Sequence, residues 1–173
     1  MIELRIPVRM ATAVALAWLL SACWVSERPL LTDETSTVIS FAGDYRSAGD
    51  GATRLEIVAS GGNSYLTTDG KDPIPTRFLA LRGSWYLMQY QASDDSEKEQ
   101  VFLYNLLDAS DGELRIHGVE CEDTKGEFEG MTRDDGACRF SALAGLKAAA
   151  LAQIAGLESG SLTAEPSVFE RAP

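Results

Sequence analysis

The stretch RFLALRGSWYLMQYQ, residues 77–91, decides the fold. Gly83-Ser84 divides it into two runs of strand-forming residues, and glycine at the first central position of a two-residue loop suits a type II′ turn because it tolerates positive φ. The second run is apolar on both faces of a strand: Trp85 and Leu87 on one, then Tyr86, Met88 and Tyr90 on the other. Because successive side chains point to opposite faces, we expect one face to line the core and a helix to cover the other.

Similar runs recur at regular spacing on both sides of this hairpin. Residues 55–59 show an apolar period near two, and Ser60-Gly61-Gly62-Asn63 is a strong turn signal. Further strand-like runs cover residues 38–45, 64–68, 100–107 and 113–119. The pattern predicts a mainly β fold of about seven or eight strands, arranged as a small antiparallel meander barrel or as a sandwich.

A single helix is predicted after the last of these strands. Residues 142–155 are rich in Ala and Leu, which are strong helix formers. Ser141 is a suitable N-cap and Gly156 a suitable terminator. Apolar side chains recur at helical spacing and predict a stripe that packs on the sheet: Leu143, Leu146, Ala150, Ile154 and Leu157.

The first 23 residues carry the clearest targeting signal. Arg5 and Arg9 precede an uncharged run, Met10–Leu20. These eleven residues would make a helix of about 16 Å, which is too short for a bilayer core of about 30 Å. The run therefore fits the apolar region of a secretory signal peptide; a buried N-terminal helix with an incidental cysteine is the alternative.

The end of this run, Leu20-Ser21-Ala22-Cys23, resembles the lipobox of bacterial lipoproteins. The resemblance implies a diacylglycerol on the Cys23 thiol, cleavage before Cys23 and acylation of the new amine. Two or three acyl chains hold a protein firmly on a membrane. Trp24 stands where Asp would retain a lipoprotein in the inner membrane of enteric bacteria, so the chain is similar to the group sorted to the outer membrane. We therefore expect a cell-envelope protein with a lipid anchor, on the periplasmic face of the outer membrane.

These signals divide the chain into four parts. Residues 1–22 are the expected signal peptide and residues 23–37 a lipidated tether, because polar residues dominate after Leu31 and Pro29 breaks any helix. Residues 38–157 form the β-rich domain with its helix. Residues 158–173 lack periodicity and are expected to be a flexible tail.

Composition excludes some classes of function. The chain of 173 residues carries 15 Lys+Arg against 26 Asp+Glu, a formal net charge of −11. In this chain acidic residues outnumber the Lys and Arg residues that bind nucleic-acid phosphates, so we expect no nucleic-acid partner. Once Cys23 carries lipid, Cys121 and Cys138 remain as an even pair in an exported protein and are predicted to form a disulfide. A zinc site is the weaker alternative, since His117 is the only further soft ligand.

No catalytic or metal-binding set stands out, and no cofactor is predicted. His117 lies on the polar side of an alternating strand, where an exposed histidine is a better interpretation than a general base. The loop of residues 122–137 contains six acids that could hold Ca²⁺, but their order does not match the EF-hand pattern. The aromatic residues of two strands either line an apolar pocket or pack in the core, which is the preferred reading: Trp85, Tyr86, Tyr90, Phe102 and Tyr104.

A meander barrel with a late helix is also similar in arrangement to the lipocalins, and Gly83-Ser84-Trp85 resembles their Gly-x-Trp motif. In lipocalins that motif lies on the first strand, whereas here it is in mid-chain, so the likeness concerns architecture alone. We expect a non-enzymatic binding module for an apolar ligand or a periplasmic partner. The alternatives are a structural or assembly lipoprotein that acts through protein contacts only, and a hydrolase that uses carboxylates or His117.

Overall fold

A computed structural model describes residues 24–49, 51–60, 63–69, 71–92 and 100–173. The predicted signal peptide, residues 1–22, and the predicted lipidation site, Cys23, lie outside these ranges. Among the described residues, no helix is long and apolar enough to cross a membrane.

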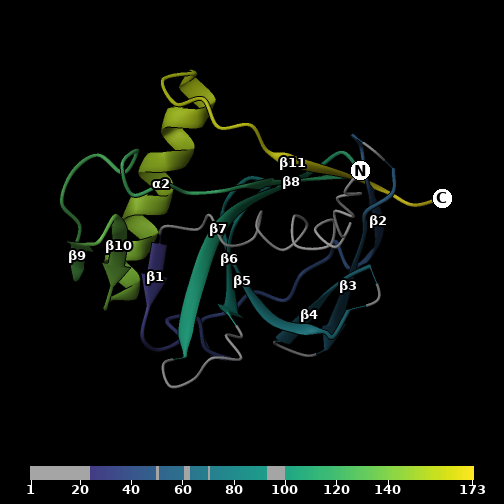
Figure 1. The fold of residues 1–173 in the computed structure, drawn as a ribbon, viewed down its shortest axis with the longest axis horizontal. Coiled ribbons are helices and arrows are strands. Elements are labelled where there is room, and N and C mark those ends of the chain that lie inside the picture. Colours follow the sequence, from purple (N-terminus) through teal and green to yellow (C-terminus); the bar gives the residue numbers. More distant parts are fainter. Residues whose placement is uncertain (1–23, 50, 61–62, 70, 93–99) are drawn as a thin grey trace, which may run out of the picture.

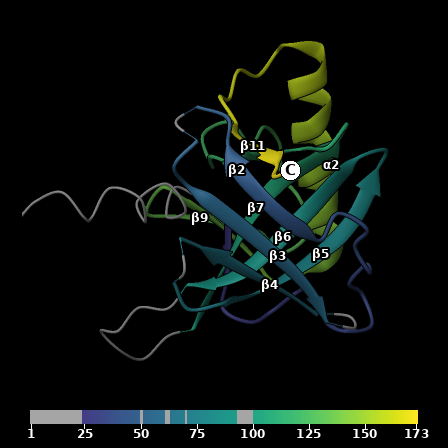
Figure 2. The ribbon, with the colours of Figure 1, turned by 90° about the vertical axis from the view of Figure 1, so that its right-hand side faces the viewer.

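Eight antiparallel strands close into a barrel in the order β6-β5-β4-β3-β2-β11-β8-β7, and β6 pairs with β7 to complete it. The fold class is thus confirmed as mainly β with a barrel rather than a sandwich (Figures 1 and 2). Strands β2 to β8 follow one another as a meander, and the last strand of the chain fills the place between β8 and β2. The barrel strands are β2 (Gly43–Ser47), β3 (Arg54–Ser60), β4 (Asn63–Thr68), β5 (Ile74–Arg82), β6 (Trp85–Ala92), β7 (Val101–Ser110), β8 (Glu113–His117) and β11 (Ser167–Arg171).

The β5–β6 and β7–β8 connections have the turn chemistry that tight hairpins need. Gly83 has a φ of 54°, so the positive φ expected at this position is confirmed. Asp111 and Gly112, between β7 and β8, have φ values of 53° and 81°, and positive φ at both central residues is what a type I′ turn requires.

The prediction that residues 158–173 form a flexible tail is wrong. Strand β11 pairs with β8 on one side and with β2 on the other, with Phe169 opposite both Leu114 and Ser47. Without it, two strands would expose unpaired backbone groups, which is costly. The chain end is therefore an integral part of the barrel wall.

The predicted tether is also wrong for the described residues 24–37. Strand β1 (Trp24–Ser26) runs antiparallel to β7 and parallel to β10 (Ala137–Phe140). Trp24 is 0% exposed and its Nε1 donates to Thr124 Oγ1 at 2.7 Å. Leu30 and Leu31 are buried too. A short strand that depends on distant partners carries little local signal, so polar composition alone was misleading here.

A small extension completes the sheet beyond β1. Strand β10 forms a hairpin with β9 (Met131–Asp134) through Asp135 and Gly136, both with positive φ. The predicted disulfide is present between Cys121 and Cys138, whose Cα atoms are 5.2 Å apart. Arg133 donates to the carbonyl oxygens of Cys121 and Thr124 at 2.7 and 2.5 Å, which fixes the acidic loop beside the disulfide.

Helix α2 (Leu143–Ser159) stands beside the barrel wall next to β1 and β10 (Figure 1). Its ends differ from the prediction. Ser141 donates its hydroxyl to the Gly130 carbonyl instead of capping the helix, and the helix continues through Gly156 to end at Gly160, which has a φ of 71°. The predicted stripe is confirmed, since Leu146, Ala150 and Ile154 are each 0% exposed.

The wall formed by β6 and β7 separates two apolar clusters, as the sequence of β6 predicted. The barrel interior holds one cluster, which includes Phe78, Met88 and Leu107. The second lies between the outer face of the wall and helix α2, and includes Leu87, Leu106 and Leu146. Because residues alternate along each strand, β6 and β7 contribute to both. The barrel is therefore filled by its own side chains.

Candidate functional site

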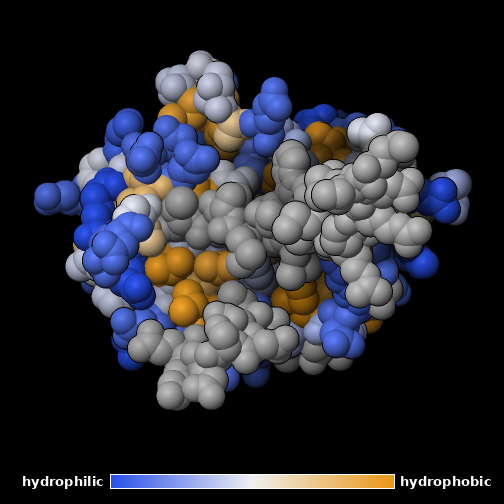
Figure 3. Space-filling model, in the orientation of Figure 1, coloured by the Kyte–Doolittle hydropathy of each residue, from blue (hydrophilic) through white to orange (hydrophobic). Residues whose placement is uncertain are grey.

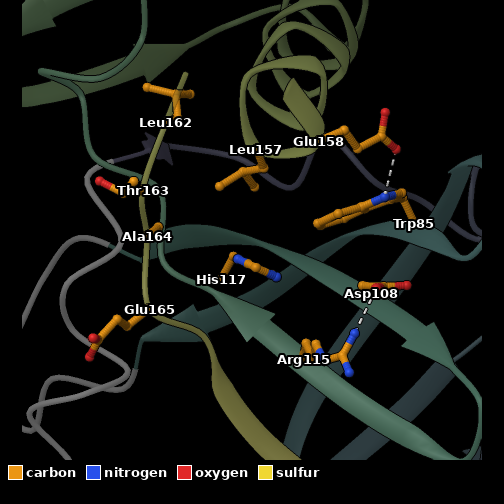
Figure 4. Close-up of a pocket in the computed structure, with 10 residues that line it drawn as sticks. All are labelled: Trp85, Asp108, Arg115, His117, Leu157, Glu158, Leu162, Thr163, Ala164 and Glu165. Carbon is orange, nitrogen blue, oxygen red and sulfur yellow. Dashed lines mark hydrogen bonds and ion pairs between the residues drawn. The ribbon is translucent and has the colours of Figure 1, made fainter. Parts of the chain in front are cut away.

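An open groove of about 400 Å³ lies on the outer face of the barrel, below the end of α2 (Figure 4). One side is the wall of β6, β7 and β8, and the other is the segment that leads from α2 to β11. The residues that line it are Trp85, Asp108, Arg115, His117, Leu157, Glu158, Leu162, Thr163, Ala164 and Glu165.

The strand register builds the floor of this groove. Trp85 lies opposite Asp108, and Asp108 lies opposite Arg115, so these three form one row across β6, β7 and β8. His117 is two residues further along β8 on the same face, diagonal to Asp108. Such diagonal neighbours have Cα atoms roughly 7–8 Å apart, within reach of a bridging group.

The roof comes from the last turn of α2 and the segment after it. The backbone N–H groups of Ser161 and Leu162 both donate to the Gly156 carbonyl, at 3.0 and 3.1 Å. A Cβ at Gly156 would lie 2.5 Å from Leu162 Cδ1, so any other residue there would require the Leu162 side chain to shift. The turn holds Leu162 against the helix and directs residues 163–166 across the groove.

Trp85 links the floor to the roof. Its indole Nε1 donates to Glu158 Oε1 at 3.1 Å, and Glu158 Oε2 accepts from Arg82 Nη2 at 2.5 Å. The Trp85 ring also lies 5.1 Å from the His117 ring between centroids, with a tilt of 46°. These contacts fix one aromatic wall of the groove.

His117 is not the exposed residue that the alternating pattern predicted. It is 8% exposed, because Trp85 and the segment after α2 cover the outer face of β8. Burial lowers the pKa of the imidazole, with a smaller opposing effect from Asp108, so the ring is neutral at pH 7. Its Nδ1 atom is buried and has no hydrogen-bond partner among the residues that the structure describes.

Asp108 has a similar unmatched atom. Its side chain is 14% exposed, and Oδ1 is buried without a hydrogen-bond partner in the described part of the chain. Oδ2 accepts from Ser110 Oγ at 3.3 Å and lies 3.9 Å from Arg115 Nη1. Arg115 is held more closely by Glu113, at 2.6 Å. Asp108 therefore keeps one free acceptor at the floor of the groove.

Other residues considered in the sequence do not gather in this groove. The five aromatic residues divide between the two apolar clusters, so they do not line one pocket. In the acidic loop, Asp134 pairs with Arg139 at 3.6 Å. Within the described ranges, no group of three or more His, Cys, Asp or Glu residues is arranged to hold a metal ion.

A second groove, of about 510 Å³, lies between β9, β10 and the segment after β1. Its lining includes Glu27, Arg28 and Arg139, but no buried side-chain atom without a partner. The first groove is thus the better candidate site.

An assembly protein that acts through protein contacts is expected to expose an apolar patch. The large hydrophobic residues that are exposed in the described chain are Val38, Val58 and Leu151, which come from three different parts of the fold. The side of Figure 3 that carries β9 and β10 is mostly hydrophilic.

One feature of the sequence could have predicted part of the groove. A two-residue turn at Asp111-Gly112 places Asp108 opposite Arg115, so this pair follows from the hairpin register. Glu158 and Glu165 had no such signal, because they reach the groove only through the packing of α2.

Comparisons of the chain with protein-family models, with curated proteins and with solved structures find no match. The geometry of the groove therefore carries the functional interpretation.

Proposed function

We propose that this protein is a lipid-anchored lipoprotein of the cell envelope that acts as a non-enzymatic binding module. The lipobox supports attachment through Cys23, and Trp24 supports the outer membrane as its location. The domain then holds its ligand on the periplasmic side, at the groove between β6–β8 and the end of α2.

The observation that carries the binding role is that two buried atoms of this groove, Asp108 Oδ1 and His117 Nδ1, lack a hydrogen-bond partner among the described residues. The third such atom, Asn105 Oδ1, belongs to the barrel interior, where Asn105 Nδ2 donates to Tyr90. Folded proteins give nearly all buried polar groups a hydrogen-bond partner. Each group left without one costs about 1–3 kcal/mol. Two such atoms in one groove destabilise the fold when no ligand is bound, and hydrogen bonds from a ligand would offset this cost.

The filled barrel supports this choice of site. Buried side chains from all around the wall occupy the interior, among them Tyr45, Phe78 and Leu107, each 1% exposed. An apolar ligand would have to displace them, whereas the groove already has an open volume of about 400 Å³ beside its buried polar floor. The binding role is therefore assigned to the outer wall and not to the lumen.

The anchor is tested by expressing the full chain in a Gram-negative host. We expect it in the membrane fraction, with an intact mass of residues 23–173 plus a diacylglycerol and an acyl group. A Cys23→Ser variant should keep its first 22 residues and carry no lipid. An unmodified thiol at Cys23 in the wild type would refute the anchor.

The binding role is tested on the same membrane-extracted protein by native mass spectrometry. We expect an additional small-molecule mass that Asp108→Asn loses. Asp44→Asn is the matched control, because Asp44 is exposed on β2 and pairs with Arg54 outside the groove. If wild type and Asp108→Asn both carry no added mass, binding at this groove is refuted.

A further inference from the structure

The charges around the groove are unequal. Three carboxylates line it, from Asp108, Glu158 and Glu165, against one guanidinium, from Arg115. The nearest ion-pair partners, Arg82 and Glu113, add one charge of each sign and leave the excess negative. The neutral His117 does not change this balance, so the local field favours a cation.

The unmatched atoms have a chemical preference as well. An ionised carboxylate only accepts hydrogen bonds, so Asp108 Oδ1 needs a donor. Neutral imidazole accepts at one nitrogen, and with its proton on Nε2 the Nδ1 atom of His117 also accepts from a donor. An ammonium group carries three donors and can serve both atoms.

The remaining surface of the groove is apolar and partly aromatic. Figure 4 shows the His117 ring in the middle of the groove, with Trp85 and Asp108 on one side and Thr163 and Ala164 on the other. Leu157 and Leu162 add aliphatic surface from the roof. An indole face attracts cations and stacks on flat rings. The volume of about 400 Å³ is at the small end of the range for ligand pockets.

We propose that this groove binds a small organic cation, an amine with a flat apolar body, whose ammonium group reaches Asp108 while its body packs against Trp85 and the leucines of the roof. This inference rests on the proposed binding role of the same groove, and it adds the class of ligand.

Entry requires a small movement. Both unmatched atoms are shielded from solvent, so the ammonium group reaches them only after part of the cover shifts. Residues 163–166, which cross the groove between α2 and β11, are neither helix nor strand. They can move while the Gly156–Leu162 turn and the β11 pairing stay in place.

The test is a calorimetric titration of the detergent-solubilised protein with phenethylamine, using micelles alone as the blank. Two probes of similar shape serve as controls, 3-phenylpropionate with a negative charge and 2-phenylethanol with none. We expect phenethylamine to saturate with a Kd of about 1 mM or tighter, and the two control probes to bind at least about tenfold more weakly.

Variants locate the binding. Asp108→Asn should weaken phenethylamine by about tenfold or more, and Asp44→Asn should leave it unchanged. Glu165 is exposed, so Glu165→Gln should have little effect on folding. Its expected two- to threefold loss of affinity for phenethylamine is a second, independent check.

Three results would overturn the inference: no saturable binding of phenethylamine up to about 10 mM, equal affinity for the three probes, or equal affinity of wild type and Asp108→Asn. The outcome is separable from that of the binding role itself. If the membrane-extracted protein carries a mass that depends on Asp108 but does not bind phenethylamine, the groove is a binding site and its ligand is not an organic cation.

Discussion

The outer wall of β6–β8 carries two buried polar sites, which differ in whether their side-chain atoms have hydrogen-bond partners. Gln89 and Tyr104 lie where the N-terminal segment crosses the wall, and His117 and Asp108 lie where the C-terminal segment crosses it. In the first site every side-chain polar atom named has a partner. In the second, two atoms have no partner within the described ranges.

The Gln89 site holds the N-terminal segment against the barrel wall. Gln89 Oε1 accepts from the backbone N–H groups of Leu30 and Leu31 at 2.9 and 2.8 Å, and Nε2 donates to the Leu31 carbonyl at 3.1 Å. Tyr104 shares a 2.6 Å hydrogen bond with Ser26 and donates to Gln89 at 3.1 Å. Burial raises the pKa of Tyr104 to about 12, so its hydroxyl stays protonated. Matched polar groups here hold a segment in one place.

The His117 site has the same burial without the same matching. Its segment is held by apolar contacts and by the turn at Gly156, and the polar floor below it is left free. Matched polar atoms therefore mark the Gln89 site as one that stabilises the fold, and unmatched atoms mark the His117 site as one that is available to a ligand.

The largest effect is expected from removing the N-terminal segment. A chain of residues 32–173 loses Trp24, Leu30 and Leu31, and buried residues of these types each contribute about 2–5 kcal/mol. The total loss, above about 5 kcal/mol, approaches the whole stability of a domain. Circular dichroism and denaturant unfolding should show no cooperative transition, whereas residues 24–173 should unfold cooperatively. Equal stability of the two chains would mean that the segment is only a tether.

The next effect is expected from Gln89→Leu. Three backbone groups of Leu30 and Leu31 lose their partners, at a cost of about 3–5 kcal/mol in unfolding free energy. Gln91→Leu, a half-buried position two residues along the same strand, is the control and should change stability by less than about 1 kcal/mol. Urea denaturation of both variants measures the difference. If Gln89→Leu lowers the unfolding free energy by no more than Gln91→Leu does, Gln89 does not hold the N-terminal segment in place.

The smallest effect on unfolding free energy is expected from His117→Phe, which should not destabilise the protein. The variant keeps an aromatic ring beside Trp85 and removes the unmatched Nδ1 atom, so unfolding free energy should stay within about 1 kcal/mol of wild type or rise. A loss above about 3 kcal/mol in the same urea experiment would show that His117 serves the fold.

The same variant should alter the dependence of stability on pH. Because burial lowers the pKa of His117, the unfolded chain takes up a proton below about pH 6.5 while the folded chain resists it. Stability is therefore full above that pH and is lost as pH falls toward the folded-state pKa. The charge of Asp108 opposes this effect and that of Arg115 reinforces it. His117 is the only histidine, so His117→Phe should flatten the change in Tm between pH 7.5 and 5.5; an unchanged slope would contradict the pKa direction.

Much of the fold followed from local patterns. The two-sided apolar character of β6 predicted its place between two cores, and Gly83 predicted the hairpin. The helix stripe and the disulfide pair were equally readable, because each depends on residue spacing or on the pairing of cysteines.

What the sequence did not predict depends on distant contacts. Strand β1 is three residues long, and its burial comes from β7, β10 and Thr124, far along the chain. His117 was placed on the polar side of its strand correctly, but no local signal shows that α2 and the segment after it would cover that side. The groove therefore became visible only in three dimensions.

The position of Trp24 also has a mechanical meaning. It lies fully inside the fold and in register with Cys138, so any group carried by the preceding residue is separated from the barrel wall by a single Cα–Cα step of about 3.8 Å. A lipid attached there would be joined to the folded domain without a long flexible linker, and the domain would therefore lie close to the leaflet.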